Sequence, residues 1–233
     1  MRHLLITGAG RGLGRALALA ALKRGAHVFA GVRDPSAWPD PPPNLDVIML
    51  DVTVPASIAD ARRTIGARTS SLDLLINNAG IHQGSPEVRS APEVSFGSLD
   101  GEGLLRMVDT NAAGPMRVTQ AFADLLARGD RPIAMHLSSR KGALTEKHDG
   151  GNYGYCASKA ALNMVGRALA HDLAPLGITS VVVHPGLVRT QMGGPDAPLA
   201  PEDAADALLD LAARLEPSDR GRFLRWDGSE HPW

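Results

Sequence analysis

Short apolar runs alternate along the chain with longer segments in which apolar residues return every three or four positions. Residues 4–6 are apolar without interruption, as expected of a strand buried on both faces of a parallel sheet. Four glycines at alternate positions follow, and a helical pattern then extends to about Lys23, with Gly25 placed as its C-terminal cap. The same patterns predict strands at 28–32, 47–50, 72–76, 132–137, 179–183 and 222–226, and helices at 56–67, 103–127, 153–173 and 201–215.

The connecting segments agree with this alternation. Residues 35–43 are dense in proline and predict neither helix nor central strand, while the polar stretches 83–101 and 140–152 predict loops. Strands that alternate with helices predict an α/β fold, a Rossmann-type doubly wound parallel sheet of about seven strands with helices on both faces. No linker or repeat interrupts the pattern, so we expect a single domain over residues 1–233.

Composition narrows the class of protein. The chain has 233 residues, 44% of them hydrophobic, and a net charge of −1, so we expect no nucleic-acid or membrane partner. The single cysteine, Cys156, excludes an internal disulfide, and the apolar strand pattern begins too early for a signal peptide. We therefore expect a cytoplasmic protein.

The glycine turn after the first strand predicts an anion site. Strand, glycine turn and helix together direct backbone N–H groups and a helix N-terminus at a phosphate, which a Cβ would keep away. The usual G-x-G-x-x-G spacing fails because Leu13 occupies the third glycine's place, and Thr7-Gly8-x-x-x-Gly12-x-Gly14 stands instead.

Tyr155 and Lys159 form the most informative pair of residues. A separation of four puts the phenol and the ammonium on one face of a helix. A phenol normally titrates near 10, and a cation one turn away lowers its pKa toward the working range. The pattern therefore predicts a tyrosine that transfers protons.

Further polar residues follow the predicted strands, where a parallel sheet collects its sites. They are Asp51, Asn77–Gly80, Ser139 and Pro185-Gly186, and Asn111 lies within the long helix. The eight histidines show no metal-ligand spacing, so no metal is expected. Ser139 has no nucleophile elbow, which argues against a hydrolase.

These motifs, in this order, resemble those of the short-chain dehydrogenase/reductase family along essentially the whole chain. The segments 150–155, 188–199 and 228–233 resemble the C-factor and sniffer-type carbonyl reductase branch. The resemblance implies an NADP(H)-dependent oxidoreductase that transfers hydride between a nicotinamide cofactor and a carbonyl or alcohol substrate. A dinucleotide-binding signalling protein of C-factor type, acting through a protein partner, is the alternative. A homodimer is possible within either interpretation.

The resemblance also implies residue roles. Tyr155 is the general acid in carbonyl reduction and the general base in alcohol oxidation, and Lys159 lowers its pKa and binds the nicotinamide ribose. Ser139 holds the substrate oxygen, and Asn111 holds a water that links Lys159 to solvent. The remaining cofactor contacts are Gly8, Arg11, Gly12 and Leu13 at the diphosphate, Asp51 and Val52 at the adenine, Asn78, Ala79 and Gly80 at the adenosine ribose, and Val188 and Thr190 at the nicotinamide.

Two interpretations compete for the cofactor type. Asp34 lies about 20 residues after the glycines, where an acid binds the ribose of NAD. Val32, however, occupies the position that the family's NAD enzymes fill with aspartate, and Arg33 follows it. Arg33, together with Arg11 approaching from the glycine turn, would bind the 2′-phosphate, so NADP(H) is favoured over NAD(H).

The C-terminal segment carries two of the three tryptophans, Trp226 and Trp233. An exposed apolar end would favour aggregation, so we expect residues 223–233 to pack on the body of the protein.

Overall fold

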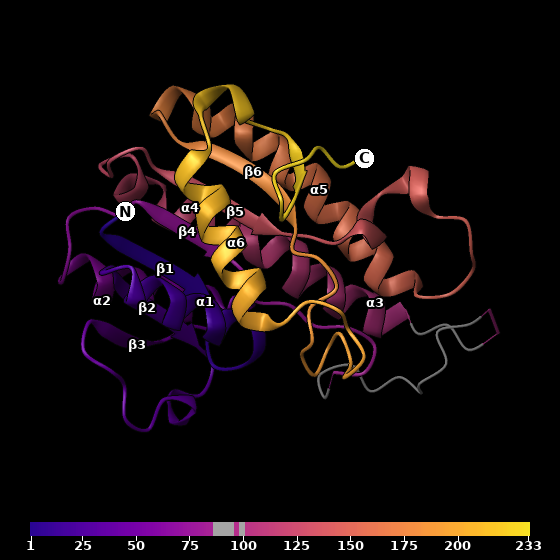
Figure 1. Ribbon diagram of the computed structural model, residues 1–233, viewed down its shortest axis with the longest axis horizontal. Coiled ribbons are helices and arrows are strands. Elements are labelled where there is room, and N and C mark those ends of the chain that lie inside the picture. Colours follow the sequence, from indigo (N-terminus) through magenta and orange to yellow (C-terminus); the bar gives the residue numbers. More distant parts are fainter. Residues whose placement is uncertain (86–95, 98–100) are drawn as a thin grey trace.

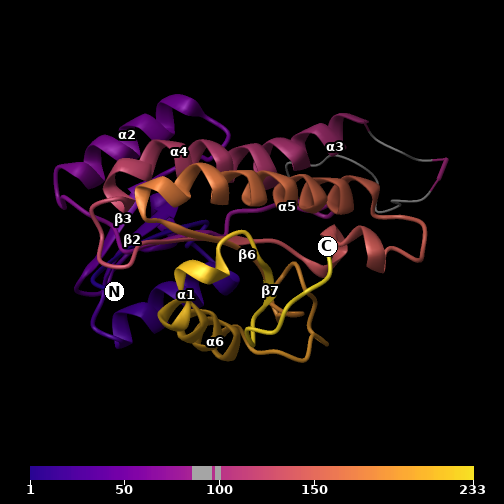
Figure 2. The ribbon, with the colours of Figure 1, turned by 90° about the horizontal axis from the view of Figure 1, so that it is seen from above.

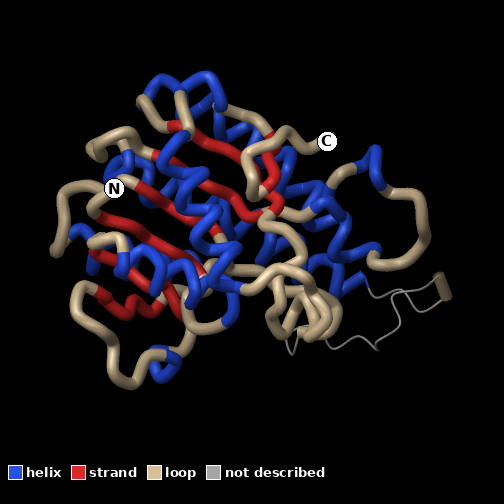
Figure 3. The backbone as a smooth tube through the Cα atoms, viewed as in Figure 1, coloured by secondary structure: helices blue, strands red, loops and turns tan. Residues whose placement is uncertain are grey.

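A computed structural model describes residues 1–85, 96–97 and 101–233, and it contains a seven-stranded parallel sheet in the order β3-β2-β1-β4-β5-β6-β7 (Figure 3). The strands are β1 (His3–Thr7), β2 (His27–Val32), β3 (Leu45–Met49), β4 (Leu74–Asn77), β5 (Ile133–Leu137), β6 (Thr179–His184) and β7 (Phe223–Arg225). The helices are α1 (Gly12–Lys23), α2 (Pro55–Gly66), α3 (Gly101–Val108), α4 (Gly114–Leu126), α5 (Tyr153–Leu173) and α6 (Pro201–Arg214). The predicted fold class is confirmed.

Helices cover both faces of the sheet, as Figure 2 shows from above. On one face, α1 and α6 pack with side chains such as Leu17 and Leu208 against Ile6 and Val183. On the other face, α2, α4 and α5 cover residues such as Leu5 and Phe29. Because both faces are covered, the central strands are apolar at nearly every position, which is the signal that the sequence carried.

The predicted helix 103–127 is interrupted, and this corrects the prediction of one continuous helix. A π-helical turn, Asp109–Ala113, separates α3 from α4, and the Gly114 N–H donates to the carbonyl of Asp109 five residues earlier. Pro115 explains the interruption: it has no N–H for the carbonyl of Asn111 four residues before it, and its ring collides with that carbonyl in a regular helix.

Two loop predictions also need refinement. The proline-rich segment 35–43 begins with a 3₁₀ turn, Pro35–Ala37, because proline tolerates the first helical position. The predicted loop 140–152 contains two further 3₁₀ turns, Arg140–Gly142 and Leu144–Glu146. The predicted loop 83–101 lies largely outside the described residues.

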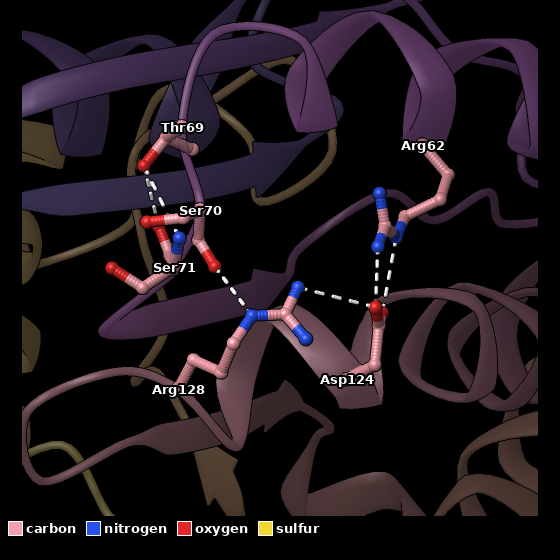
Figure 4. A network of polar contacts seen from close by, with 6 residues as sticks. All are labelled: Arg62, Thr69, Ser70, Ser71, Asp124 and Arg128. Atoms are coloured by element: carbon pink, nitrogen blue, oxygen red, sulfur yellow. Dashed lines mark hydrogen bonds and ion pairs between the residues drawn. The ribbon is translucent and has the colours of Figure 1, made fainter.

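An arginine–aspartate network joins the helices on the α2–α4 side of the sheet (Figure 4). Arg62 of α2 donates from Nε to Asp124 of α4 at 3.1 Å, and Arg128 donates to the same carboxylate at 3.2 Å. Arg128 also donates to the backbone carbonyl of Ser70 at 2.7 Å, before β4 begins. These contacts hold the pKa of Asp124 below its usual value and tie α2, α4 and the approach to β4 together.

The C-terminal segment packs on the body, as predicted. Phe223 and His231 are buried, and their rings lie 4.6 Å apart. The carbonyl of Trp233 accepts a hydrogen bond from the Thr145 hydroxyl at 2.9 Å, and Arg167 lies over its indole. Across the described part of the chain, no helix is long and apolar enough to cross a membrane.

His136 makes the sheet sensitive to acid. It is fully buried in β5, where Asn77 Nδ2 donates to its Nδ1 and Ser180 Oγ lies 3.1 Å from its Nε2. The amide donor requires the neutral imidazole, and burial lowers the His136 pKa from 6.5 to about 4.

We therefore expect the free energy of unfolding to fall as pH decreases from about 6.5 to about 4. In this interval His136 binds a proton in the unfolded chain but stays neutral in the native protein. The loss from His136 is on the order of 3 kcal/mol. Chemical denaturation at several pH values measures it. His136→Gln should flatten this slope and His148→Gln, at an exposed position, should not; equal slopes in all three proteins would contradict the assignment.

Candidate active site

A cleft of about 1190 Å³ opens at the C-terminal ends of the strands. It is lined by every site residue predicted from the sequence except Asn111, namely Gly8, Arg11, Gly12, Leu13, Arg33, Asp51, Val52, Asn78, Ala79, Gly80, Ser139, Tyr155, Lys159, Val188 and Thr190. Asn111 is fully buried behind this surface. The topology thus brings together residues from six strand ends that are far apart in sequence.

The glycine turn has the geometry of a phosphate cradle. Gly8 has a φ of +67° and Gly12 a φ of +53°, a backbone region that side chains rarely adopt. A Cβ on Gly14 would lie 2.3 Å from the carbonyl oxygen of Gly8, so only glycine lets α1 start this close to the turn. The N-terminus of α1 consequently faces the cleft, where its free N–H groups favour an anion.

Thr7 and Asn78 fix this turn to the end of β4. The Thr7 hydroxyl accepts hydrogen bonds from the backbone N–H groups of Asn78 and Ala79, both at 3.0 Å. The Asn78 side chain donates to the carbonyl oxygens of Thr7 and Gly8 at 2.9 and 3.2 Å. Thr7 is a site residue to which the sequence assigned no role, although it opens the glycine motif.

The cleft wall beyond β2 and β3 carries the residues that bear on cofactor type. Val32 ends β2 and is buried, and the exposed Arg33 follows at the cleft. Asp34 turns back to accept a hydrogen bond from the Ser36 N–H at 2.9 Å, which lowers its pKa. The Asp51 carboxylate likewise accepts a hydrogen bond from the Thr53 backbone N–H, at 2.8 Å.

Arg11 does not point where the sequence placed it. Its guanidinium donates to Gln191 Oε1 at 2.9 Å, and its charge contributes to the lowered pKa of His82, after burial of that ring. Arg11 therefore faces the segments that follow β4 and β6, and the expected approach to Arg33 from the other side is wrong for this structure. The Arg11 side chain is long and flexible, and its partner Gln191 is brought near it only by the fold.

Val188 and Thr190 lie across the cleft from the glycine turn. Val188 is buried and pairs with Leu199 in an isolated bridge. The Thr190 methyl group would lie 3.3 Å from a Cβ on Gly12, so this segment closes over the start of α1. Gln191, which meets Arg11, was not predicted, and no local pattern marks it.

The four predicted catalytic residues lie around the junction of β5, α5 and the π-helical turn. Lys159 is buried, and its Nζ donates to the carbonyl oxygen of Leu137 at 2.8 Å, while it lies 5.8 Å from the centre of the Tyr155 ring. Ser139, the second residue after β5, lies beside the Tyr155 hydroxyl and acts to lower the Tyr155 pKa.

Asn111 supports this group from behind. Its Oδ1 accepts from the Ile81 N–H, and its Nδ2 donates to the Ile81 carbonyl, both at 2.8 Å. Nδ2 also donates to the Ser158 hydroxyl at 2.9 Å, which connects the π-helical turn to α5. Ser158 is a supporting residue that the sequence did not indicate.

Burial is the largest cause of the pKa shifts of both Tyr155 and Lys159. Burial raises the pKa of Tyr155 to about 12, although Ser139, beside the hydroxyl, acts in the opposite direction. It lowers the pKa of Lys159 to about 8. The lowering of the Tyr155 pKa that we expected from the neighbouring ammonium is absent from this structure: the shift is upward, its largest cause is burial, and Lys159 is not among its causes.

Known proteins share this arrangement. The family model described as short chain dehydrogenase matches residues 2–198. The C-signal protein of Myxococcus xanthus is 41% identical over 165 residues, which cover 71% of this chain and 95% of that protein. Carbonyl reductase Sniffer of D. melanogaster superposes over 100% of both chains with a TM-score of 0.91 at 29% identity.

A second solved structure, the NADPH-bound carbonyl reductase from chicken fatty liver, covers 100% of this chain and 99% of its own, with a TM-score of 0.90 at 30% identity. The predicted resemblance to the family and to its carbonyl reductase branch is confirmed. This protein belongs to the short-chain dehydrogenase family and is an oxidoreductase.

Proposed function

We propose that this protein is an NADPH-dependent carbonyl reductase in which Tyr155 donates the proton. The observation that carries the proposal is the placement of Tyr155 beside Ser139 and the buried Lys159, in a cleft that begins in a phosphate cradle. The NADPH bound by the chicken carbonyl reductase supports the cofactor.

The cradle fits a dinucleotide. Gly8 and Gly14 allow the turn, the start of α1 and the end of β4 to pack closely together, and the start of α1 supplies N–H donors for a diphosphate. Asp51, Val52 and residues 78–80 would border the adenosine, and Val188 with Thr190 would border the nicotinamide end. A bound NADPH would supply a hydride to the substrate carbon.

The chain's own residues account for the proton. With a pKa of about 12, Tyr155 stays protonated near neutral pH, the state that carbonyl reduction needs in its acid. Ser139 would hold the carbonyl oxygen within reach of the Tyr155 hydroxyl. Asn111, beside Lys159 in the buried part of the site, would hold a water that links Lys159 to solvent and returns the proton to Tyr155.

A panel of aldehydes and ketones tests the proposal, with loss of NADPH absorbance as the readout. We expect turnover with at least one member. A protein that binds NADPH but reduces none of them would contradict the proposal and favour a binding function instead. The predicted cytoplasmic location and homodimer stay predictions.

Arg33 should set the cofactor preference. A guanidinium forms charge-assisted bonds with a 2′-phosphate that a hydroxyl cannot replace, so we expect Arg33→Ala to lower the ratio of kcat/KM for NADPH over NADH by about 10- to 100-fold. Asp34→Asn should raise that ratio, because it removes the negative charge that adjoins Arg33 in the sequence. Wild-type preference for NADH, or an unchanged ratio in Arg33→Ala, would contradict the assignment.

A further inference from the structure

A second cavity adjoins the catalytic cleft on the side where substrate would enter. It has a volume of about 300 Å³ and is lined by Arg140, Lys141, Ala143, Glu146, Lys147, His148, Asp149 and Cys156. Its volume is at the lower end of the range of small-molecule sites, about 300–1,000 Å³. The loop between β5 and α5 that forms it is the coral segment at the right of Figure 1, beyond the first turn of α5.

Arg140 and Lys141 line both the small cavity and the catalytic cleft. They are the basic residues common to the two, and they directly follow Ser139. Both are exposed. A group bound by them would therefore be attached to a molecule whose other end reaches Ser139 and Tyr155.

The charges of this cavity do not cancel. Lys147 is paired with Asp149 at 2.7 Å, and Glu146 lies 3.7 Å from His231. Within residues 1–85, 96–97 and 101–233, neither Arg140 nor Lys141 forms an ion pair. Asp149 acts on Lys141 only through space, in addition to its contact with Lys147, so among the described residues the two cations that border the cleft have no carboxylate in direct contact.

The backbone beneath these two cations is held in place. The Ser139 hydroxyl accepts from the Lys141 N–H at 3.2 Å, and Asn163 Nδ2 donates to the Gly142 carbonyl at 3.1 Å. A Cβ on Gly142 would lie 2.7 Å from the Lys159 carbonyl carbon, so this turn rests directly on α5. Arg140 and Lys141 therefore start from a support that is fixed relative to the reacting hydroxyl.

The field of Arg140 reaches the opposite wall. Burial lowers the pKa of His184 to about 4, and the charges of His231, Arg140 and Arg225 act in the same direction. His184 ends β6 and lines the cleft. The His184 imidazole therefore stays neutral near neutral pH and adds no positive charge of its own to the cleft.

We propose that Arg140 and Lys141 bind an anionic group, a carboxylate or a phosphate, on the carbonyl substrate. The inference rests on the proposed function and names the substrate class: aldehydes or ketones that carry an anion at the end remote from the reacting carbon. Arginine and lysine bind such groups through charge-assisted hydrogen bonds that a neutral substrate cannot form.

Matched aldehydes test this substrate class. 4-Formylbenzoate and 4-formylphenyl phosphate carry the anion, and methyl 4-formylbenzoate is the neutral comparison. We expect kcat/KM for at least one anionic aldehyde to exceed that for the ester about tenfold, and its KM to rise with salt. The aldehyde that shows the preference distinguishes carboxylate from phosphate.

Arg140→Gln and Lys141→Gln should each lower this anionic-to-neutral ratio severalfold. Arg225→Gln is the matched control, because Arg225 also acts on His184 but lines neither cavity. Equal kcat/KM for anionic and neutral aldehydes in the wild type, or the same fall in all three variants, would overturn the inference.

A binding measurement separates this inference from the proposed function. NADP⁺ has no hydride to donate, so calorimetric titration of each aldehyde into the protein saturated with NADP⁺ reports binding alone. We expect the anionic aldehyde to bind more tightly to the wild type than to Arg140→Gln. Absence of turnover with every aldehyde would contradict the carbonyl reductase proposal, whereas equal affinity in both proteins would overturn the anion site.

Discussion

Tyr155→Phe should reduce kcat by about 10²- to 10⁴-fold, the range that a positioned general acid contributes. The substitution removes one hydroxyl and leaves the ring, so the affinity for NADPH should change by no more than a few-fold. Lys159→Ala should lower both kcat and affinity, because Lys159 is buried and holds the Leu137 carbonyl at the end of β5. Steady-state kinetics and NADPH titration measure the two effects separately.

The chain contains its own control. Its second tyrosine, Tyr153, lies at the exposed start of the same helix, two residues before Tyr155. Tyr153→Phe should retain wild-type kcat, since its ring does not line the cleft. Near-full activity in Tyr155→Phe would show that the proton comes from another group.

Removal of residues 225–233 should lower the melting temperature by about 10 °C. The deletion uncovers Phe223 and takes away His231 and Trp233, and loss of a large packed aromatic side chain costs about 3–5 kcal/mol. In a chain of this size each kcal/mol corresponds to about 2–4 °C. Differential scanning calorimetry provides the measurement.

The same deletion should impair activity. The tail contacts the site from two directions: Trp233 accepts from Thr145 in the loop after β5, and Trp226 lies against Gly186 after β6. Glu230→Gln, at an exposed tail residue whose side chain pairs with Arg222, should leave the melting temperature within about 1 °C. A truncated protein with unchanged melting temperature and activity would refute the packing role of the tail.

The sequence was sufficient for those features that are local in the chain. The alternation of apolar strands with amphipathic helices, the glycine turn after β1 and the four-residue spacing of Tyr155 and Lys159 depend on neighbouring residues alone. Parallel order then follows from right-handed crossovers, and it collects the strand ends at one edge. Nearly all of the site residues predicted from the sequence therefore line the cleft.

One local signal was present and not used. Pro115, four residues after Asn111, predicts the interruption between α3 and α4, because proline cannot serve the carbonyl four positions earlier. The π-helical turn that results brings the Asn111 amide to Ile81 and Ser158. Those partners lie 30 and 47 residues away, and no spacing rule identifies them.

By itself, the sequence determined the fold class, the family and a set of candidate site residues that nearly all line the cleft, since each follows from periodicity or from motifs within a few positions. Only the tertiary structure decided how these residues behave. The pKa of Tyr155 rises because packing removes water from its hydroxyl, and Arg11 meets Gln191 because β1 and β6 end at the same edge of the sheet. Burial and long-range pairing depend on all elements at once, so they exist only in the folded chain.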